Sequence, residues 1–515
     1  MSDATDHGSQ IDASTFASVE QLRSWCHRVG SVGLRGTGSP THEDLIAWIE
    51  DELHRVPGLA VRSESFDLLR WAPVPEGDLE RAATLSVDGS EVAVAGAVPY
   101  SLGTDAEGPL RYLPPGVPIT RENAAGAIVL RDFPDLPLPY DVLLSMADHI
   151  SPDSEDLRGQ VFDRPALADS ILHDELIAAG DAGAAGLLVA FDLPRDQVCG
   201  YFEPHKGCHY RVPAAYVGVD ERDALRAGVA VGATAQLAVT ATASAGTTRN
   251  LYATLHGRSA ERIVIVSHTD GNTWVQENGI AALLAMAHFF AAIPADERHH
   301  TIEFAFTSAH LHISREGGRH YAEQLDRDYE DGTVSFVFVL EHLGARELVP
   351  VDRTDGPGRR LEFTGETEPV LWAVGPSPAL KQAVVRAIED RDLKRIVATS
   401  GMGFPVEGQV PRIASFGGLG TYFHTYLVPT TSIITAPWSL WAPAFGEDAI
   451  DFDVLRQQAL AATDVVRSLD GVARDVVAGA YLEDRRARAA GAPTAHEPEP
   501  PETTDSSRSD VEGPA

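Results

Sequence analysis

The second half of the chain alternates short apolar runs with longer helix-like segments, and this alternation restricts the fold more than any other feature. The apolar runs include RIVIVSH at 262–268, TIEFAFTSAH at 301–310 and VSFVFVLEHLG at 334–344. Helical spacing of apolar residues follows at 279–292, near 317–327 and at 453–470. Strands that are apolar at consecutive positions are buried on both faces of a sheet. The pattern therefore predicts an α/β fold with a mixed central sheet flanked by helices.

The first half of the chain has a different pattern of apolar residues and turns. Residues 14–75 read as two amphipathic helices and a strand, whereas short β-rich runs broken by Gly and Pro extend from about 80 to 245. We therefore predict an α/β domain formed by 14–78 and 246–478, with a β-rich domain at 79–245 inserted into it. Residues 1–13 and 484–515 are predicted to be disordered, because they offer little apolar surface to bury.

Composition limits the partners of the protein. The 515 residues carry a formal net charge of -34, which repels the phosphates of nucleic acid and the anionic face of a membrane. No apolar run reaches the roughly 18 residues that a membrane-spanning helix needs. The N-terminal sequence has no signal-peptide pattern, and the three cysteines form no CxxC motif, so we expect a cytoplasmic protein with reduced thiols. Assembly into a homo-oligomer is left open.

Three of the predicted strands end in residues that bind metals. His268 and Asp270 end the first, His310 follows the second, and Glu341 and His342 end the third. In α/β sheets, functional sites form at the carboxyl ends of the strands. Any one of these histidines on its own is more simply explained as a solvated or capping residue. Imidazoles and carboxylates at three strand ends together favour a site for zinc or a similar divalent ion.

One pair of segments resembles a known family. TRNLYATLHGRSAERIVIVSHTDG at 248–271, followed by ENGIAALLAMAHFF at 277–290, is similar to the co-catalytic zinc aminopeptidases of peptidase clan MH. That clan also holds glutamate carboxypeptidase and glutaminyl cyclase. The region at 79–245 resembles the protease-associated domain that many members carry. The resemblance covers about 20 to 475 and implies a zinc-exopeptidase-like fold with one or two divalent ions, zinc being expected.

The resemblance assigns roles to individual residues. His268 matches the first metal-ligand His of the family, and Asp270 matches the Asp that orients it. Glu277 stands where a metal-bridging Asp is expected, and Glu341 takes the place of an Asp ligand. His342, beside Glu341, is an additional candidate ligand.

Other positions depart from the family pattern. Where the family has Glu-Glu, this chain has Ala309-His310 or a neighbouring register, so the carboxylate base is missing and His310 becomes the candidate base. Gly420 stands where the family has a late metal-ligand His, and His424 is the candidate replacement. His312 is a further candidate ligand near the second strand end.

Three residues are candidates for contact with a substrate. Glu407, Trp438 and Trp441 fall in loops that approach the substrate in the family, and the two Trp side chains could line an apolar pocket. Simple packing explains the two Trp residues equally well.

Three functional hypotheses remain at this point. The leading one is a divergent, aminopeptidase-like metalloprotease or amide hydrolase, with a rebuilt metal site for one ion or two and a peptide or small-molecule substrate. The second is a non-catalytic member that keeps the fold for binding or assembly. The third is an enzyme repurposed for another reaction on a small molecule.

Overall fold

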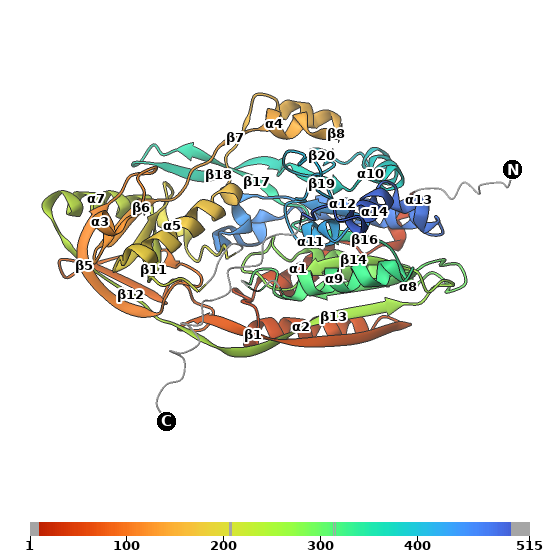
Figure 1. The fold of residues 1–515 in the computed structure, drawn as a ribbon, viewed down its shortest axis with the longest axis horizontal. Helices are drawn as coiled ribbons and strands as arrows, with labels where there is room; N and C mark the ends of the chain where they lie inside the picture. The colour runs from red at the N-terminus through yellow and green to blue at the C-terminus, as the bar shows by residue number, and fades with distance from the viewer. Residues whose placement is uncertain (1–9, 205–208, 313, 315, 496–515) are drawn as a thin grey trace.

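The computed structural model describes residues 10–204, 209–312, 314 and 316–495 (Figure 1). Within them, nine strands form one mixed sheet that runs through the main body of the molecule. In spatial order they are β1 (Leu59–Pro73), β13 (Ala241–Leu255), β15 (Thr301–Thr307), β14 (Arg262–His268), β16 (Val334–Leu340), β21 (Thr430–Ile434), β19 (Val370–Val374), β20 (Ile396–Thr399) and β8 (Ala147–Ile150).

The centre of this sheet is parallel and buried. Strands β15, β14, β16 and β21 are parallel neighbours, and nearly all of their residues are buried. Alternate residues of β14 pack into two different cores: Ile263 and Ile265 into one, Val264 and Val266 into the other. The wholly apolar runs of the sequence thus form strands covered on both faces, and the predicted α/β class is confirmed.

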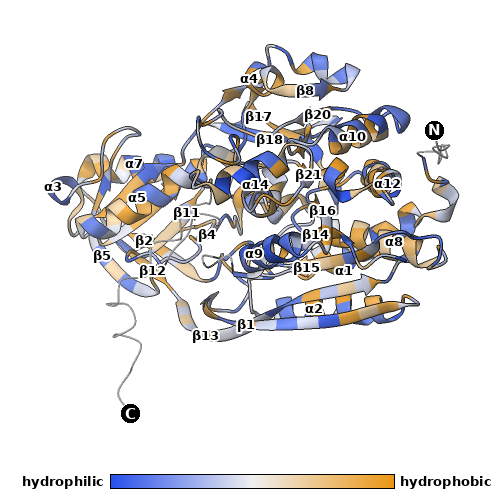
Figure 2. Ribbon diagram, turned by 45° about the vertical axis from the view of Figure 1, so that its right-hand side comes forward, coloured by the Kyte–Doolittle hydropathy of each residue, from blue (hydrophilic) through white to orange (hydrophobic). Residues whose placement is uncertain are grey.

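Helices cover both faces of the sheet. The first core contains residues of α1 (Val19–Gly30), α8 (Gly279–Ala291), α10 (Pro378–Asp390) and α12 (Phe452–Leu469). The second contains residues of α9 (Glu316–Glu330), α11 (Gly420–Thr425) and α13 (Arg474–Ala478). Helix α8 is apolar along most of its length, as Figure 2 shows, because it lies between the sheet and α1. None of the described helices has the length and apolar composition needed to cross a bilayer.

The helix that precedes the first strand has a capped start. Helix α2 (Pro40–His54) has Ser39 at its N-cap, and the Ser39 hydroxyl accepts a hydrogen bond from the backbone N–H of His42. Pro40 occupies the first helical position, where a missing N–H has no consequence. This start holds the preceding Gly-rich turn, which reaches the candidate site described below.

A second sheet is built from the region at 79–245, called the insertion below. In spatial order its strands are β3 (Ser90–Val92), β2 (Ala83–Val87), β12 (Thr234–Val239), β5 (Thr104–Tyr112), β6 (Ile128–Asp132), β10 (Gly186–Ala190), β11 (Ala214–Val217) and β4 (Gly96–Ala97). Strands β5, β6, β10 and β11 are parallel. The insertion also contains helices α5 (Asp169–Ala182) and α7 (Val219–Val231) and the strand pair β7 (Leu138–Pro139) and β9 (Val161–Phe162).

Two connections tie the insertion to the body. The chain leaves the body along β1 and returns along β13, and these strands pair over their full length. Strand β8, which lies inside the predicted insertion boundaries, instead joins the edge of the nine-stranded sheet beside β20. The predicted boundary at 79–245 therefore does not separate the two sheets completely, because a four-residue edge strand is too short to be assigned from its pattern. A ribbon of β17 (Arg346–Asp352) and β18 (Arg359–Thr367) extends from the body.

The structure differs from the disorder predicted at the two ends. Helix α14 (Tyr481–Ala489) enters the range 484–515, and its Arg485 is buried in ion pairs with Asp326 and Glu330. Near the other end, the backbone N–H of Ile11 donates to Asp464 at 2.7 Å. Residues 1–9 and 496–515 lie outside the described residues.

Candidate metal centre

The carboxyl ends of two parallel strands bring three metal-binding side chains together. His268 is the last residue of β14, and Glu341 and His342 follow β16. One ligand atom from each residue lies within 4.8 Å of the others, and all three residues are buried. Register explains the meeting, because Val266 of β14 is paired with Val339 of β16. The sequence-predicted ligands His268, Glu341 and His342 therefore form one cluster.

Hydrogen bonds orient each member of the cluster. Nδ1 of His268 donates to the carbonyl of Asp270 at 2.9 Å, and Nδ1 of His342 donates to the carbonyl of Thr435 at 2.6 Å. These bonds fix the tautomers and leave each Nε2 as an acceptor, the form that binds a metal. Oε2 of Glu341 accepts from the backbone N–H of Leu419 at 3.0 Å. The sequence did not indicate Thr435 or Leu419, because both act through backbone groups that every residue type has.

The turn that presents Glu341 and His342 is held by Asn278. Its side chain accepts from the N–H of Leu343 at 2.7 Å and donates to the Leu343 carbonyl at 2.6 Å. His342 has a φ of 56°, a left-handed conformation that costs a non-glycine residue about 1–2 kcal/mol. Gly279 allows α8 to start against this turn, because a Cβ there would lie 2.1 Å from the Leu340 carbonyl oxygen. The Glu-Asn-Gly sequence before α8 thus shapes the cluster.

Two atoms of the cluster are buried without a hydrogen bond. Within the described residues, Nε2 of His268 and Oε1 of Glu341 have no hydrogen-bond partner, although they are 3.7 Å apart. A buried polar atom left in this state costs about 1–3 kcal/mol. Two imidazole nitrogens and a carboxylate oxygen are also the three protein ligands typical of a catalytic zinc ion. The residues present therefore fit a divalent ion.

His310 lies beside the cluster. Its ring centroid is 4.6 Å from that of His268, and its Nε2 is 3.5 Å from Oε1 of Glu341. The residue comes from the end of β15, the strand parallel to β14 on the other side. All three predicted strand ends therefore contribute to this region, as the sequence pattern indicated.

Asp270 acts on the site through the backbone as well as through its charge. Its carboxylate accepts from the Thr37 hydroxyl at 2.6 Å and from the backbone N–H groups of His310 at 3.3 Å and Leu311 at 2.8 Å. The carboxylate oxygen Oδ1 is 3.6 Å from Nδ1 of His268, so the bond that orients this imidazole comes from the Asp270 carbonyl. Asp270 thus ties the end of β14 to the end of β15.

The pKa shifts follow from burial and neighbouring charge. Burial raises the pKa of Glu341 to about 7, and the charge of His268 offsets this only in part. Burial and the charge of His268 lower the pKa of His342 to about 3. Burial acts to raise the pKa of Asp270, but the hydrogen bond and charge of His268 lower it below its usual range. Glu341 is thus a carboxylate whose charge the protein alone does not compensate.

Glu277 is not part of the cluster, contrary to the prediction that it binds metal. Both of its oxygens accept from Arg35, at 2.6 Å from Nε and 2.8 Å from Nη2, and both side chains are fully buried. Arg35 also donates to the carbonyls of Gly33 and Thr273, and its backbone pairs with Gly271. A carboxylate held by two guanidinium bonds has its counter-charge already. The only sequence signal for Arg35 was its place in a Gly-rich turn.

His424 has a structural role, which corrects its prediction as a metal ligand. Its Nδ1 is 2.6 Å from the hydroxyl of Tyr481, its Nε2 is 2.8 Å from the carbonyl of Ile413, and its ring stacks on Phe416. Both ring nitrogens are therefore occupied. Burial lowers the pKa of His424 to about 4. Gly420 could not carry a ligand either, because a Cβ there would lie 2.7 Å from the Cβ of Ser432.

The remaining candidates lie outside the cluster. His312 is bonded to the hydroxyl of Ser314 at 2.7 Å and to the carbonyl of Leu69 at 3.1 Å. Glu407 is exposed in the loop before Val410. Trp438 and Trp441 are buried, and Trp438 lines a cavity in which its Nε1 donates to the Asp163 carbonyl at 2.9 Å. Their contact with a substrate stays a prediction.

Several solved structures share this fold. The aminopeptidase from Aneurinibacillus sp. strain AM-1 is 16% identical, with a TM-score of 0.55 over 88% of this chain and 95% of that one. BSAP, a zinc aminopeptidase from Bacillus subtilis, is 16% identical, with a TM-score of 0.61 over 87% and 94%. A peptidase M28 precursor from Shewanella amazonensis SB2B is 15% identical, with a TM-score of 0.59 over 92% and 94%.

The sequence itself finds no such match. No family model matches it, and no curated protein sequence does. At 15–16% identity the structural likeness establishes the fold, which is that of the zinc aminopeptidases.

Proposed function

We propose that the protein is a metal-dependent hydrolase of an amide or peptide bond, similar to an aminopeptidase, with a single divalent ion, zinc, held by His268, Glu341 and His342. The observation that carries this proposal is the pair of buried atoms, Nε2 of His268 and Oε1 of Glu341, that lack a hydrogen bond within the described residues. Both belong to residues at the carboxyl ends of parallel strands, where α/β enzymes hold their sites. The fold shared with a zinc aminopeptidase adds support.

A single ion is proposed because the other nearby carboxylates are already bound. Asp270 accepts three hydrogen bonds, from the Thr37 hydroxyl and two backbone N–H groups. Glu277 accepts two from Arg35. Of the three, only Glu341 keeps a carboxylate oxygen without a hydrogen bond. Arg35 thus supplies, as a fixed guanidinium, the positive charge that a second ion would bring.

The bound ion, His310 and Asp270 would have different roles in hydrolysis. When bound, a divalent ion would polarise the scissile carbonyl and favour ionisation of a water molecule. His310, with Nε2 at 3.5 Å from Glu341, lies where it can accept the proton of the attacking water, because an imidazole is a suitable base near neutral pH. Asp270 holds the backbone of His310 and supplies negative charge beside His268. The absent carboxylate base is therefore replaced by an imidazole.

The main alternative is a non-catalytic protein that keeps the fold for binding. It predicts that the cluster takes up no ion, whereas the unpartnered buried atoms favour a bound cation. An enzyme with a different reaction at the same ion differs from the proposal only in its substrate.

Metal analysis of the full chain tests the proposal. We expect about one equivalent of zinc per chain, which is lost in His268→Ala and kept in His320→Ala, an exposed histidine that serves as the matched control. Aminoacyl anilides and small amides then report hydrolysis, which should disappear in His310→Gln while the zinc remains. A wild-type protein that binds no ion under any condition, with His268→Ala indistinguishable from it, would overturn the proposal.

A further inference from the structure

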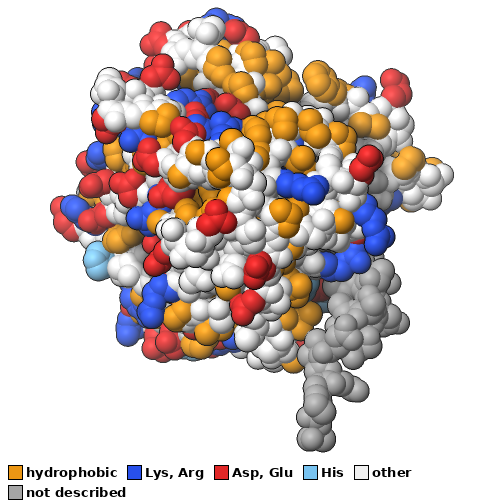
Figure 3. Space-filling view, turned by 90° about the vertical axis from the view of Figure 1, so that its left-hand side faces the viewer, with side chains coloured by type: hydrophobic (Ala, Val, Ile, Leu, Met, Phe, Trp, Pro, Cys, Tyr) orange, Lys and Arg blue, Asp and Glu red, His pale blue; other side chains and the backbone are white. Residues whose placement is uncertain are grey.

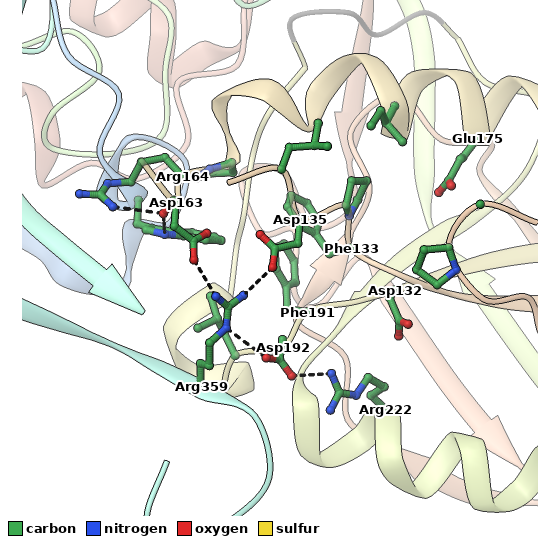
Figure 4. A pocket seen from close by; sticks show the side chains of 18 residues that line it. Asp132, Phe133, Asp135, Asp163, Arg164, Glu175, Phe191, Asp192, Arg222 and Arg359 are labelled. Carbon is green, nitrogen blue, oxygen red and sulfur yellow. Dashed lines mark hydrogen bonds and ion pairs between the residues drawn. The ribbon is translucent and has the colours of Figure 1, made fainter. Parts of the chain in front are cut away.

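A cavity of about 500 Å³ lies in the insertion, and none of the three proposed metal ligands lines it (Figure 4). Asp132 and Phe133 border it at the end of β6, and Phe191 and Asp192 border it at the end of β10. These two strands are parallel neighbours. The cavity thus occupies the carboxyl edge of a parallel sheet, the usual place for a ligand in such folds, and its volume is within the range of about 300–1,000 Å³ found for small-molecule sites.

Aromatic rings form one wall of the cavity. Phe133 and Phe191 stack with their ring centroids 4.2 Å apart and their planes at 21°. Trp438 reaches the cavity from the body, and the hydrogen bond from its Nε1 to the Asp163 carbonyl fixes its indole. Rings held in this way receive a flat apolar group or a cation on their faces.

The charged residues of the wall have an excess of carboxylates. Arg359, from β18, contacts Asp163 at 2.6 Å, Asp192 at 3.1 Å and Asp135 at 3.3 Å (Figure 4). Arg222 is the other guanidinium at this wall, and it contacts Asp192 at 2.6 Å. Three aspartates thus share two arginines. Burial, together with the charges of Asp163 and Asp192, raises the pKa of Asp135, as expected where negative charge is in excess.

A further carboxylate oxygen lies at the other side of the cavity. Oε1 of Glu175 is 2.7 Å from Arg131, whereas Oε2 is buried and has no hydrogen-bond partner within the described residues. The third arginine of the lining, Arg164, is committed to Glu368 and Glu347 outside the cavity. Acidic side chains are also spread over the outer surface on this side of the molecule, as Figure 3 shows.

We infer that this cavity is a binding site for a small organic cation, an amine or amidine on a flat apolar body. The apolar body packs against Phe133, Phe191 and Trp438, and the positive group pairs with Asp135. Glu175 adds negative charge at the opposite side of the cavity. An anion is disfavoured, because the guanidinium groups of Arg222 and Arg359 are directed at aspartates. This site is independent of the proposed metal centre.

Three flat probes of the same size and different charge test the inference: benzamidine, benzamide and benzoate. We expect benzamidine to bind the full-length protein in titration calorimetry, benzamide to bind at least about tenfold more weakly, and benzoate not to bind. His268→Ala should bind benzamidine as the wild type does, so failure of the metal proposal leaves this result unaffected. Equal binding of benzamidine and benzamide, preference for benzoate, or no binding of benzamidine would overturn the inference.

Two variants test whether the probe binds in this cavity. Asp135→Asn removes a half-exposed charge and should weaken benzamidine about tenfold without changing benzamide. Ile171→Trp, at an exposed position of the lining on α5, should fill the cavity and abolish binding of both probes. Asp181→Asn is the matched control, since Asp181 lies on the same helix and also pairs with an arginine but is not part of the lining. Unchanged benzamidine binding in Ile171→Trp would contradict the assignment.

Discussion

Glu277 and Glu341 are two fully buried glutamates near His268 that differ in their hydrogen-bond partners. Glu277 receives two hydrogen bonds from a buried guanidinium, whereas Glu341 receives one backbone N–H and keeps an oxygen without a hydrogen bond. A buried carboxylate requires a counter-charge. Arg35 provides it for Glu277, whereas the proposed ion would provide it for Glu341. The difference assigns Glu277 to a buried ion pair and leaves Glu341 as the carboxylate of the proposed metal site.

The largest expected effect comes from changing Glu341, the glutamate with an oxygen that has no hydrogen bond within the described residues. Glu341→Gln should abolish zinc binding, because it removes the one nearby carboxylate with an unpartnered oxygen. The zinc-free variant should unfold at the same or a higher denaturant concentration than the zinc-free wild type, since an uncompensated buried charge is lost. Zinc content and urea unfolding of both proteins check this prediction. Retention of zinc by Glu341→Gln would be incompatible with the ligand set.

Removing the partner of Glu277 should instead destabilise the protein. Arg35→Met leaves Glu277 buried without its partner and should lower the free energy of unfolding by about 3–5 kcal/mol. Arg35→Met combined with Glu277→Leu should recover most of that loss, because neither buried charge remains. Urea unfolding measures both. A single variant as stable as the wild type would mean that the ion pair does not compensate Glu277.

The structural assignment of His424 predicts a pH dependence. Its pKa is lowered by burial to about 4, below the usual value near 6.5, so the unfolded chain binds a proton at His424 before the folded protein does. The stabilisation from neutral His424 is complete above about pH 6.5 and is lost as the pH falls to about 4, by up to about 3 kcal/mol. Comparison of the wild type with His424→Phe by urea unfolding at pH 7, 5.5 and 4.5 isolates this contribution. A stability difference that does not change with pH would contradict it, as would loss of zinc from His424→Phe.

The smallest expected effect concerns the support of Asp270. Thr37→Val removes the hydroxyl that donates to the Asp270 carboxylate at 2.6 Å and should weaken zinc binding about tenfold. Thr84→Val, at an exposed position of β2, is the control. Competition with a chromogenic chelator measures the affinity. Equal affinities in the two variants would show that Asp270 does not need this support.

The part of the site that lies on the strands was predictable from sequence. Apolar runs such as 262–268 and 334–340 have lengths that fix where the strands end, and parallel pairing brings those ends to one edge. His268, Glu341 and His342 were therefore expected together, and His310 beside them. The α/β fold followed from the same runs.

The contacts made by loops were not predictable. Arg35 lies 242 residues before Glu277, and nothing in either local sequence indicates that they meet. His424 stands four residues from the position of a family ligand, but its helix directs both ring nitrogens to Tyr481 and Ile413. Strand β8 is too short to show a pattern, and its pairing with β20 depends on the docking of the insertion on the body.

The decisive quantity is the number of zinc ions bound by a chain without the Arg35–Glu277 pair. Native mass spectrometry of the wild type and of Arg35→Met combined with Glu277→Leu, each saturated with zinc, gives this number. We expect one ion in both proteins, because His268, Glu341 and His342 are unchanged in the double variant. Two ions in the wild type, or none in a folded double variant, would contradict a single ion held by His268, Glu341 and His342.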